Sequence, residues 1–248
     1  MGQLAGKTAV VTGGSTGIGL ATAVRLGDEG AHVFVTGRRK AELDAAVETI
    51  GSATGVQGDT SDLADLDRLI AAVRDRGRGL DVLFVNAAIA SFVPLEEITE
   101  EHFDQTFGVN VRGALFTVQK ALPLLNDGAA VVLTGSTNAA RGAESFGVYA
   151  ASKAALRSFA RTWANELKGR GIRVNTVTPG PIDTPGLTGV APEGVAPSDF
   201  TDRLAAAVPL GRLGDPEEVA DAVLFLATPR SSFVTGAELA VDGGANQI

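Results

Sequence analysis

Tyr149 and Lys153 are the residues of this sequence whose types and spacing suggest chemistry most directly. They stand four positions apart in a stretch of good helix formers, so their side chains are expected to share one helix face. On an ordinary surface helix this spacing would mean only a solvated charged face. A tyrosine phenol, with a pKa of about 10, exchanges protons poorly at neutral pH, but an adjacent ammonium stabilises the phenolate and lowers that pKa. With Ser136 at the end of an apolar strand, the pair predicts a proton-transfer site.

A glycine-rich turn joins the first apolar run to the helix that follows it, in the stretch Thr12-Gly13-Gly14-Ser15-Thr16-Gly17-Ile18-Gly19. Gly13 and Gly17 let the backbone turn tightly and approach a pyrophosphate, whose charge then lies at the helix N-terminus. Gly19 lets that helix pack closely on the sheet. A glycine turn can also form without any ligand, but the strand–turn–helix context is typical of a dinucleotide site. The predicted cofactor contacts in this turn are Gly13, Ser15, Thr16, Gly17, Ile18 and Gly19.

The end of the second apolar run indicates which dinucleotide binds. A site that prefers NAD places Asp or Glu there for the 2′-hydroxyl of the adenosine ribose, whereas this chain has Gly37-Arg38-Arg39. A carboxylate would repel a 2′-phosphate, and a guanidinium can pair with it bidentately. The alternative is a solvated basic turn, although basic residues are disfavoured at the positive end of a helix. We therefore expect NADP(H), with Arg38 and Arg39 at the phosphate.

A parallel sheet is predicted to position these residues, because short β-branched runs alternate with helical stretches along the chain. Near-continuous Val, Leu and Ile is typical of strands buried on both faces. Alternation of this kind predicts right-handed βαβ crossovers. The fold class is therefore α/β, a single-domain Rossmann fold over residues 1–248 with a doubly wound parallel sheet of about seven strands between two helical layers. Strands are expected at 8–12, 32–36, 81–85, 130–134 and 172–177, with shorter candidates at 55–57 and 238–241, and helices at about 17–29, 40–49, 62–76, 100–126, 146–169 and 216–227.

Helix ends and one long loop complete this organisation. Asp215-Pro216-Glu217-Glu218 predicts a capping box with proline at the first helical position, and Thr99 is expected to cap the helix that starts at Glu100. The segment 179–200 holds five prolines and four glycines. Loops of this length are usually functional lids or disordered, and we predict a substrate lid around residues 181–209.

Composition excludes several functional classes. With 21 basic and 29 acidic residues the net charge is −8, which argues against nucleic-acid binding. Cysteine is absent, so thiolate nucleophiles, disulfides and cysteine-bound zinc are excluded. The two histidines, His32 and His102, have no helical partner, and no metal site is expected. No apolar run approaches 18 residues and no leader is evident at the start, so we expect no membrane association and a cytoplasmic location.

The sequence resembles the short-chain dehydrogenase/reductase superfamily over essentially its whole length. The segments 116–125 and Pro181-Ile182-Asp183-Thr184-Pro185 more narrowly resemble bacterial NADPH-dependent secondary alcohol dehydrogenases, which reduce ketones. Two positions depart from the family: Ala88 stands where glycine is common, and Thr16 where many NADPH-dependent members have a basic residue. The matching motifs are Thr12-Gly13…Gly17-Ile18-Gly19, Asp59, Asn86-Ala87-Ala88, Asn110, Ser136, Tyr149…Lys153 and Pro179-Gly180.

The resemblance implies a role for each matching residue. Ser136 would hold the substrate carbonyl oxygen near Tyr149, and Tyr149 would protonate the developing alkoxide while the nicotinamide delivers hydride. Lys153 would bind the nicotinamide ribose and lower the pKa of Tyr149, and Asn110 would hold a water that relays protons from Lys153. Asp59 would accept a hydrogen bond from the adenine amino group, unless it is simply a turn or cap residue. The other implied cofactor contacts are Thr60, Asn86, Ala87, Ala88, Pro179, Gly180, Ile182 and Thr184, besides Tyr149 and Lys153 themselves.

The substrate residues are expected near the reactive carbonyl and on the lid. Apolar lid residues suit a hydrophobic ketone, although each could instead anchor the loop to the core. The helix at 146–169 has more apolar surface than one sheet face needs, and the resemblance implies a homotetramer in which it and the 100–126 helix pack against neighbouring copies. The predicted substrate contacts are Ser136, Asn138, Phe146, Tyr149 and Leu187, with Ser91 and Phe200 as further candidates.

Three functions follow from these observations. The leading prediction is a carbonyl reductase or secondary alcohol dehydrogenase that transfers hydride between NADPH and a small-molecule ketone or alcohol. The alternative is a 3-oxoacyl-(acyl-carrier-protein) reductase, which would need a basic patch for its acidic partner, and the net charge disfavours that patch. A non-catalytic NADP(H)-binding sensor would have little need for Ser136, Tyr149 and Lys153 together. The residues that could form the basic patch are Arg157, Arg161, Lys168, Arg170 and Arg173.

Overall fold

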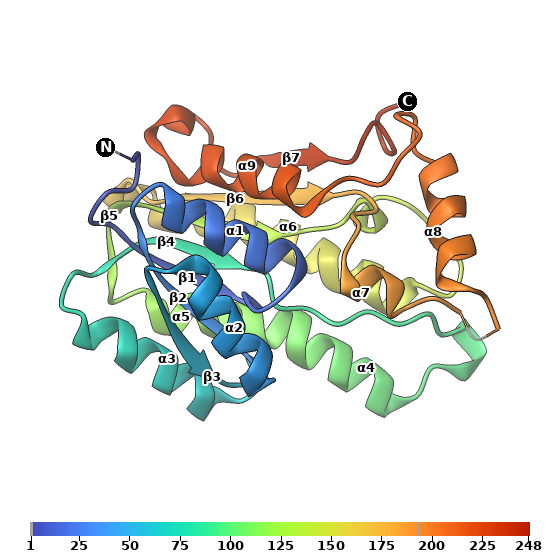
Figure 1. Cartoon of the computed structure of the whole chain (residues 1–248), viewed down its shortest axis with the longest axis horizontal. Helices are drawn as coiled ribbons and strands as arrows, with labels where there is room; N and C mark the ends of the chain where they lie inside the picture. The colour runs from blue at the N-terminus through green and yellow to red at the C-terminus, as the bar shows by residue number, and fades with distance from the viewer. Residues whose placement is uncertain (1, 193) are drawn as a thin grey trace.

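The computed structural model describes residues 2–192 and 194–248. Its centre is a seven-stranded sheet with the strand order β3-β2-β1-β4-β5-β6-β7 (Figure 1). All neighbouring strands run parallel. The direction of winding reverses between β1 and β4, where open α/β sheets bind their ligands. The strands are β1 (Thr8–Thr12), β2 (His32–Gly37), β3 (Ala53–Gln57), β4 (Leu80–Val85), β5 (Leu125–Thr134), β6 (Arg173–Pro179) and β7 (Glu238–Val241).

Helices cover both faces of this sheet (Figure 1). Helices α1 (Gly17–Asp28), α2 (Lys40–Ile50) and α9 (Pro216–Ala227) bury one apolar cluster against the strands. Helices α3 (Leu63–Asp75), α5 (Ala114–Ala121) and α6 (Gly147–Leu167) bury a second cluster on the opposite face. The central strands are apolar on both sides because both faces are covered. The predicted doubly wound α/β architecture is confirmed.

The predicted helix at 100–126 is wrong in its details. It consists of α4 (Glu100–Phe107), a π-helical segment (Gly108–Gly113) and α5. Helix α5 ends before Pro123, because proline disfavours a helical conformation at the residue preceding it. The chain at Leu125 has already joined β5 and pairs with Leu80.

The segment from 181 to 209 is more regular than predicted. It contains two helices, α7 (Pro185–Thr188) and α8 (Pro197–Ala206), each with proline in its first turn. Thr184 caps α7 by accepting a hydrogen bond from the backbone N–H of Leu187, at 3.2 Å. The prolines that suggested a loop therefore start helices, because the fixed φ of proline suits the first helical position.

Both predicted helix caps are present. Thr99 Oγ1 accepts from the backbone N–H of His102 at 3.1 Å. At the start of α9 the Glu218 carboxylate accepts from the backbone N–H of Asp215 at 2.8 Å. Each bond satisfies an N–H group that the helix itself leaves without a partner.

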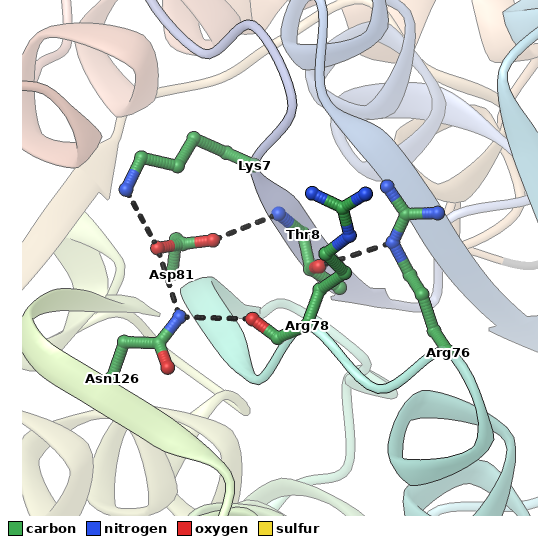
Figure 2. A network of polar contacts seen from close by, with 6 residues as sticks. All are labelled: Lys7, Thr8, Arg76, Arg78, Asp81 and Asn126. Carbon is green, nitrogen blue, oxygen red and sulfur yellow. Dashed lines mark hydrogen bonds and ion pairs between the residues drawn. The ribbon is translucent and has the colours of Figure 1, made fainter.

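A polar network fixes the edge of the sheet at which β1 and β4 begin (Figure 2). Asp81 accepts from Lys7 Nζ at 3.0 Å and from the backbone N–H of Thr8 at 2.9 Å. Asn126 Nδ2 bridges Asp81 Oδ1 and the carbonyl of Arg78, at 3.1 and 3.2 Å. These contacts join the starts of β1, β4 and β5. The candidate site lies at the opposite edge of the sheet, where these strands end. Within the described ranges, no helix is both long and apolar enough to cross a bilayer.

Candidate active site

The strands deliver the predicted site residues to one edge of the sheet. The parallel strands β1, β4, β5 and β6 end at Thr12, Val85, Thr134 and Pro179. Because the carboxyl ends of parallel strands meet at the same edge, the segments that follow these four residues lie together. The glycine turn, the Asn86 segment, Ser136 and the segment from 180 to 184 are those segments.

The structure brings Ser136, Tyr149 and Lys153 together. Ser136 follows β5 and is buried, and its side chain is close enough to Tyr149 to hydrogen-bond the phenol. Tyr149 lies in the first turn of α6, and Lys153 Nζ lies 5.7 Å from the centre of its ring. Lys153 Nζ donates to the carbonyl of Thr134 at 2.8 Å. The trio thus has the acid, the cation and the hydroxyl that proton transfer to a carbonyl oxygen requires.

Burial dominates the ionisation of this trio. It lowers the pKa of the Lys153 ammonium from 10.5 to about 8, because the side chain is almost fully removed from water. Burial also raises the pKa of the Tyr149 phenol, and the hydrogen bond from Ser136 acts in the opposite direction. The Lys153 ammonium, 5.7 Å from the ring centre, is not among the causes of this shift, so the expectation that Lys153 lowers the pKa of Tyr149 stays a prediction.

Asn110 lies in the π-helical segment and is completely buried. Its side-chain amide accepts from the backbone N–H of Ile89 at 2.8 Å and donates to the carbonyl of the same residue at 2.9 Å. It also donates to Ser152 Oγ at 3.0 Å, and Ser152 Oγ donates to the carbonyl of Tyr149 at 2.7 Å. Asn110 therefore links the β4 end to the first turn of α6. Sequence reasoning missed Ser152, because a serine beside Lys153 gives no signal of a partner 42 positions away.

The glycine turn has the conformation that its residues allow. Gly13 and Gly17 have φ values of 64° and 53°, which favour glycine. A Cβ at Gly19 would lie 2.0 Å from the carbonyl oxygen of Gly13, so the helix approaches the turn too closely for any side chain. Asn86 Nδ2 donates to the carbonyls of Thr12 and Gly13, both at 3.2 Å, and holds the turn from the next strand.

A nicotinamide dinucleotide fits the residues at this edge. The first N–H groups of α1 have no intrahelical partners and provide donors for a pyrophosphate, as the turn before them provides space. Thr16 has an extended conformation at the start of α1, and Ile18 lies in its first turn. Ser15 lies beside Gly37, with its Oγ only 2.8 Å from where a Cβ of Gly37 would stand. Residues that could hold the dinucleotide thus surround the end of β1.

The predicted adenosine residues lie at the ends of β2 and β3. Arg38 is exposed, with Nη1 3.9 Å from Asp59 Oδ2, whereas Arg39 Nε pairs with Glu42 at 3.0 Å. Asp59 Oδ1 accepts from the backbone N–H of Ser61 at 2.9 Å and from its hydroxyl at 2.7 Å, which corresponds to the alternative of a turn residue. The predicted contact Thr60 is buried beside the π-helical segment. Both arginines thus have a carboxylate partner, and Arg38, whose ion pair with Asp59 is the longer one at 3.9 Å, is the better placed of the two for a phosphate.

The remaining predicted cofactor residues line the ends of β4 and β6. Ala87 donates its backbone N–H to Thr12 Oγ1 at 3.2 Å, and Ala88 is exposed. Gly180 donates its N–H to the carbonyl of Val241 at 2.9 Å. The segment then continues through Ile182, which pairs with Gly214, to the capping residue Thr184. A Cβ at Gly17 would lie 3.1 Å from Thr184 Cγ2, so this segment reaches the glycine turn.

The predicted substrate residues lie in three places: beside Ser136, against Tyr149 and on α7. Asn138 lies beside Ser136, to which its backbone N–H donates at 3.2 Å. Phe146 is buried and stacks on the Tyr149 ring with centroids 4.4 Å apart. Leu187 lies in α7 and is partly buried. Sequence reasoning missed Phe92, whose ring stacks on Phe146 at 4.4 Å.

Comparisons with known proteins agree with this geometry. A family model described as enoyl-(acyl carrier protein) reductase matches residues 13–246. The chain is 46% identical to the oxidoreductase asL5 of Sarocladium schorii, over 99% of this chain and 98% of that protein. It is 36% identical to the 3-oxoacyl-[acyl-carrier-protein] reductase of Thermotoga maritima, over 98% of both proteins.

Solved structures are similar over the same range. A structure described as a short chain dehydrogenase/reductase family protein has a TM-score of 0.88 and 41% sequence identity, and the match covers 99% of this chain and 100% of that one. A blue fluorescent protein from a metagenomic library, solved in complex with NADPH, has a TM-score of 0.90 and 36% identity, over 98% of this chain and 99% of that one.

Proposed function

The chain belongs to the short-chain dehydrogenase/reductase family of oxidoreductases, which bind a nicotinamide cofactor, and we propose that it transfers hydride between NADPH and a ketone or secondary alcohol. The observation that carries this proposal is the convergence of Ser136, Tyr149 and Lys153 at the sheet edge that also holds the glycine turn. A dinucleotide-binding protein without chemistry has no need for a buried lysine beside a partly buried tyrosine, because burying that ammonium destabilises the fold.

The residues of the trio have separate tasks in this reaction. NADPH, when bound, supplies the hydride. Ser136 donates a hydrogen bond to the substrate oxygen and holds it beside Tyr149, which donates its proton as negative charge develops on that oxygen. With a pKa of about 8, Lys153 is still mostly protonated at pH 7, so a cation is present when Tyr149 becomes a phenolate. The hydrogen bonds of Asn110 and Ser152 hold the first turn of α6 in place during this transfer.

Support for NADPH over NADH comes from Arg38. The β2 end has no carboxylate for a ribose 2′-hydroxyl, and the exposed Arg38 guanidinium can pair with a 2′-phosphate. The similar fluorescent protein was solved with NADPH. We therefore propose NADP(H) as the cofactor.

A 3-oxoacyl-(acyl-carrier-protein) reductase is the second candidate, favoured by the Thermotoga relative. Most of its required basic patch is already engaged. Arg157 pairs with Glu238 at 2.5 Å and Arg170 with Asp127 at 3.0 Å. Arg173 donates to the carbonyl of Leu226 at 2.8 Å. Guanidiniums with internal partners are less available to an acidic carrier protein, so a free ketone is the better candidate.

We also propose that copies of this chain associate through α4, α5 and α6, as the family resemblance implied. Ala151 and Ala154 are exposed on α6, and small residues allow close helix approach. Phe103 on α4 is 45% exposed and stacks on Phe107. Sedimentation velocity at micromolar concentration tests this, and a monomer would contradict it.

Replacement of Tyr149 by phenylalanine tests the function. We expect Tyr149→Phe to lower kcat by orders of magnitude and to leave NADPH affinity nearly unchanged, because the lost proton donor acts mainly in the transition state. The assay follows NADPH absorbance with free ketones and with acyl thioesters, and NADPH affinity is measured by fluorescence titration. Retained turnover in Tyr149→Phe would exclude the assigned role, and activity on acyl thioesters alone would favour the second candidate.

A further inference from the structure

The rings of Phe146, Phe92 and Phe200 form a column that begins at Tyr149 in the candidate active site. Phe146 stacks on Tyr149 with a centroid distance of 4.4 Å and an interplanar angle of 29°. Phe92 stacks on Phe146 at 4.4 Å and 16°. Phe200, on α8, meets Phe92 edge to face at 6.2 Å and 85°. Such offset and edge-to-face arrangements are the favoured geometries for aromatic pairs.

The backbone holds the column in place. Val93, next to Phe92, donates its N–H to the carbonyl of Ser145 at 2.7 Å, next to Phe146. Among residues 2–192 and 194–248, Ser145 is the one non-glycine residue with a positive φ, at 60°. Such a conformation persists only where the surrounding structure enforces it, and it occurs preferentially near functional sites. The turn at Ser145 thus aligns two segments that are distant in the sequence so that their rings stack.

Exposure distinguishes the rings. Phe146 is 6% exposed and Phe200 9%, whereas Phe92 is 37% exposed. Phe146 is sandwiched between two rings and supports Tyr149, so it has no free face for a substrate. Phe92 is the ring of the column that a bound molecule can reach.

We infer that Phe92 determines specificity and that the substrate is a ketone carrying an extended, fused aromatic group. This inference rests on the function proposed above. Two consecutive spacings of 4.4 Å put the Phe92 ring within about 9 Å of the Tyr149 ring. Because rings in contact lie about 4 Å apart, a substrate ring bonded to the carbonyl carbon stays near Tyr149. A second, fused ring extends far enough to pack against Phe92.

An aromatic group gains more from Phe92 than a saturated group of the same size. Both bury apolar area, but only the aromatic one makes ring–ring contacts. Such contacts correspond to about a 2- to 12-fold change in an equilibrium or rate constant. Phe200 meets Phe92 at an interplanar angle of 85° and is itself buried, so Phe92 has an apolar ring on a second side as well.

The test compares two ketones that differ only in saturation. The first is 2-acetylnaphthalene, and the second is its fully saturated analogue, each reduced with NADPH by the wild-type protein, by Phe92→Leu and by Phe233→Leu. Leucine keeps an apolar side chain but removes the ring. Phe233 is fully exposed and lies just before Gly236, which bonds to Val174 near the start of β6, so its variant is the matched control at the opposite edge of the sheet.

We expect wild type to have the higher kcat/KM for 2-acetylnaphthalene. Phe92→Leu should lower that value about 2- to 12-fold and change the value for the saturated ketone less than 2-fold, while Phe233→Leu changes neither. Equal effects of Phe92→Leu on both ketones, or a wild-type preference for the saturated one, would overturn the inference and leave the proposed function intact. Failure of wild type to oxidise NADPH with either ketone would overturn both. If Phe92→Leu does not fold, the wild-type preference decides alone.

Discussion

Replacement of Lys153 by methionine should stabilise the protein while abolishing its activity. Lys153 is 2% exposed, and burial lowers the pKa of its ammonium from 10.5 to about 8. By linkage, that difference corresponds to about 3 kcal/mol of destabilisation while the group is charged. Methionine has a similar length and no charge, but it leaves the carbonyl of Thr134 without its 2.8 Å hydrogen bond, at a cost of about 1 kcal/mol. The expected net gain at pH 7 is about 2 kcal/mol.

The pH dependence of this gain identifies its cause. Below pH 8 the folded and unfolded states both hold the proton, so the full cost of the buried cation is present. Between pH 8 and 10.5 only the unfolded state holds it, and wild-type stability rises with pH by about 1.4 kcal/mol per pH unit relative to the variant. The stability advantage of Lys153→Met should therefore shrink above pH 8 and reverse between about pH 9 and 10.

Equilibrium denaturation without NADPH measures this difference, at one protein concentration and over pH 6 to 10. In thermal unfolding at pH 7, we expect a rise in Tm of about 4 to 8 °C for a chain of this size. Lys168→Met, at an exposed lysine, is the control and should change the unfolding free energy by less than about 0.5 kcal/mol. A Lys153→Met variant that is less stable at pH 7, with a difference that does not vary with pH, would show that the buried cation carries no such cost.

Three further substitutions test the elements around the site. Ser152→Ala removes two hydrogen bonds and should lower the unfolding free energy by about 1–3 kcal/mol and reduce kcat more than it raises KM; an equal effect of Ser158→Ala, on an exposed residue of the same helix, would contradict this. Arg38→Asp should shift the ratio of kcat/KM from NADPH toward NADH, and an unchanged ratio would place the phosphate elsewhere. Gly19→Ala should destabilise the fold by about 1–3 kcal/mol and weaken NADPH binding, because its Cβ would lie 2.0 Å from a backbone oxygen. Gly169→Ala, whose Cβ would have no atom nearby, should do neither. Calorimetry with and without NADPH compares the two variants.

Much of the fold could be predicted because its signals are local. The five apolar runs and the helices between them reflect periodicities of a few residues. The interrupted helix at 100–126 was not predictable in this way. Asn110 makes its bonds to Ile89 and Ser152, which are 21 and 42 positions away, and the π-helical segment is the conformation in which these bonds are seen.

The same distinction applies to the candidate site: some of its features follow from neighbouring residues, and others depend on how distant segments pack. The types and spacing of Tyr149 and Lys153, the glycine turn and the missing carboxylate after β2 belong to the sequence itself, since helix geometry and charge follow from neighbouring residues. Only the tertiary structure decided that burial raises the pKa of Tyr149 and that Phe92 stacks on Phe146, whose ring stacks on Tyr149. Desolvation and ring stacking depend on which distant segments pack around a group, and no short stretch of sequence contains that information.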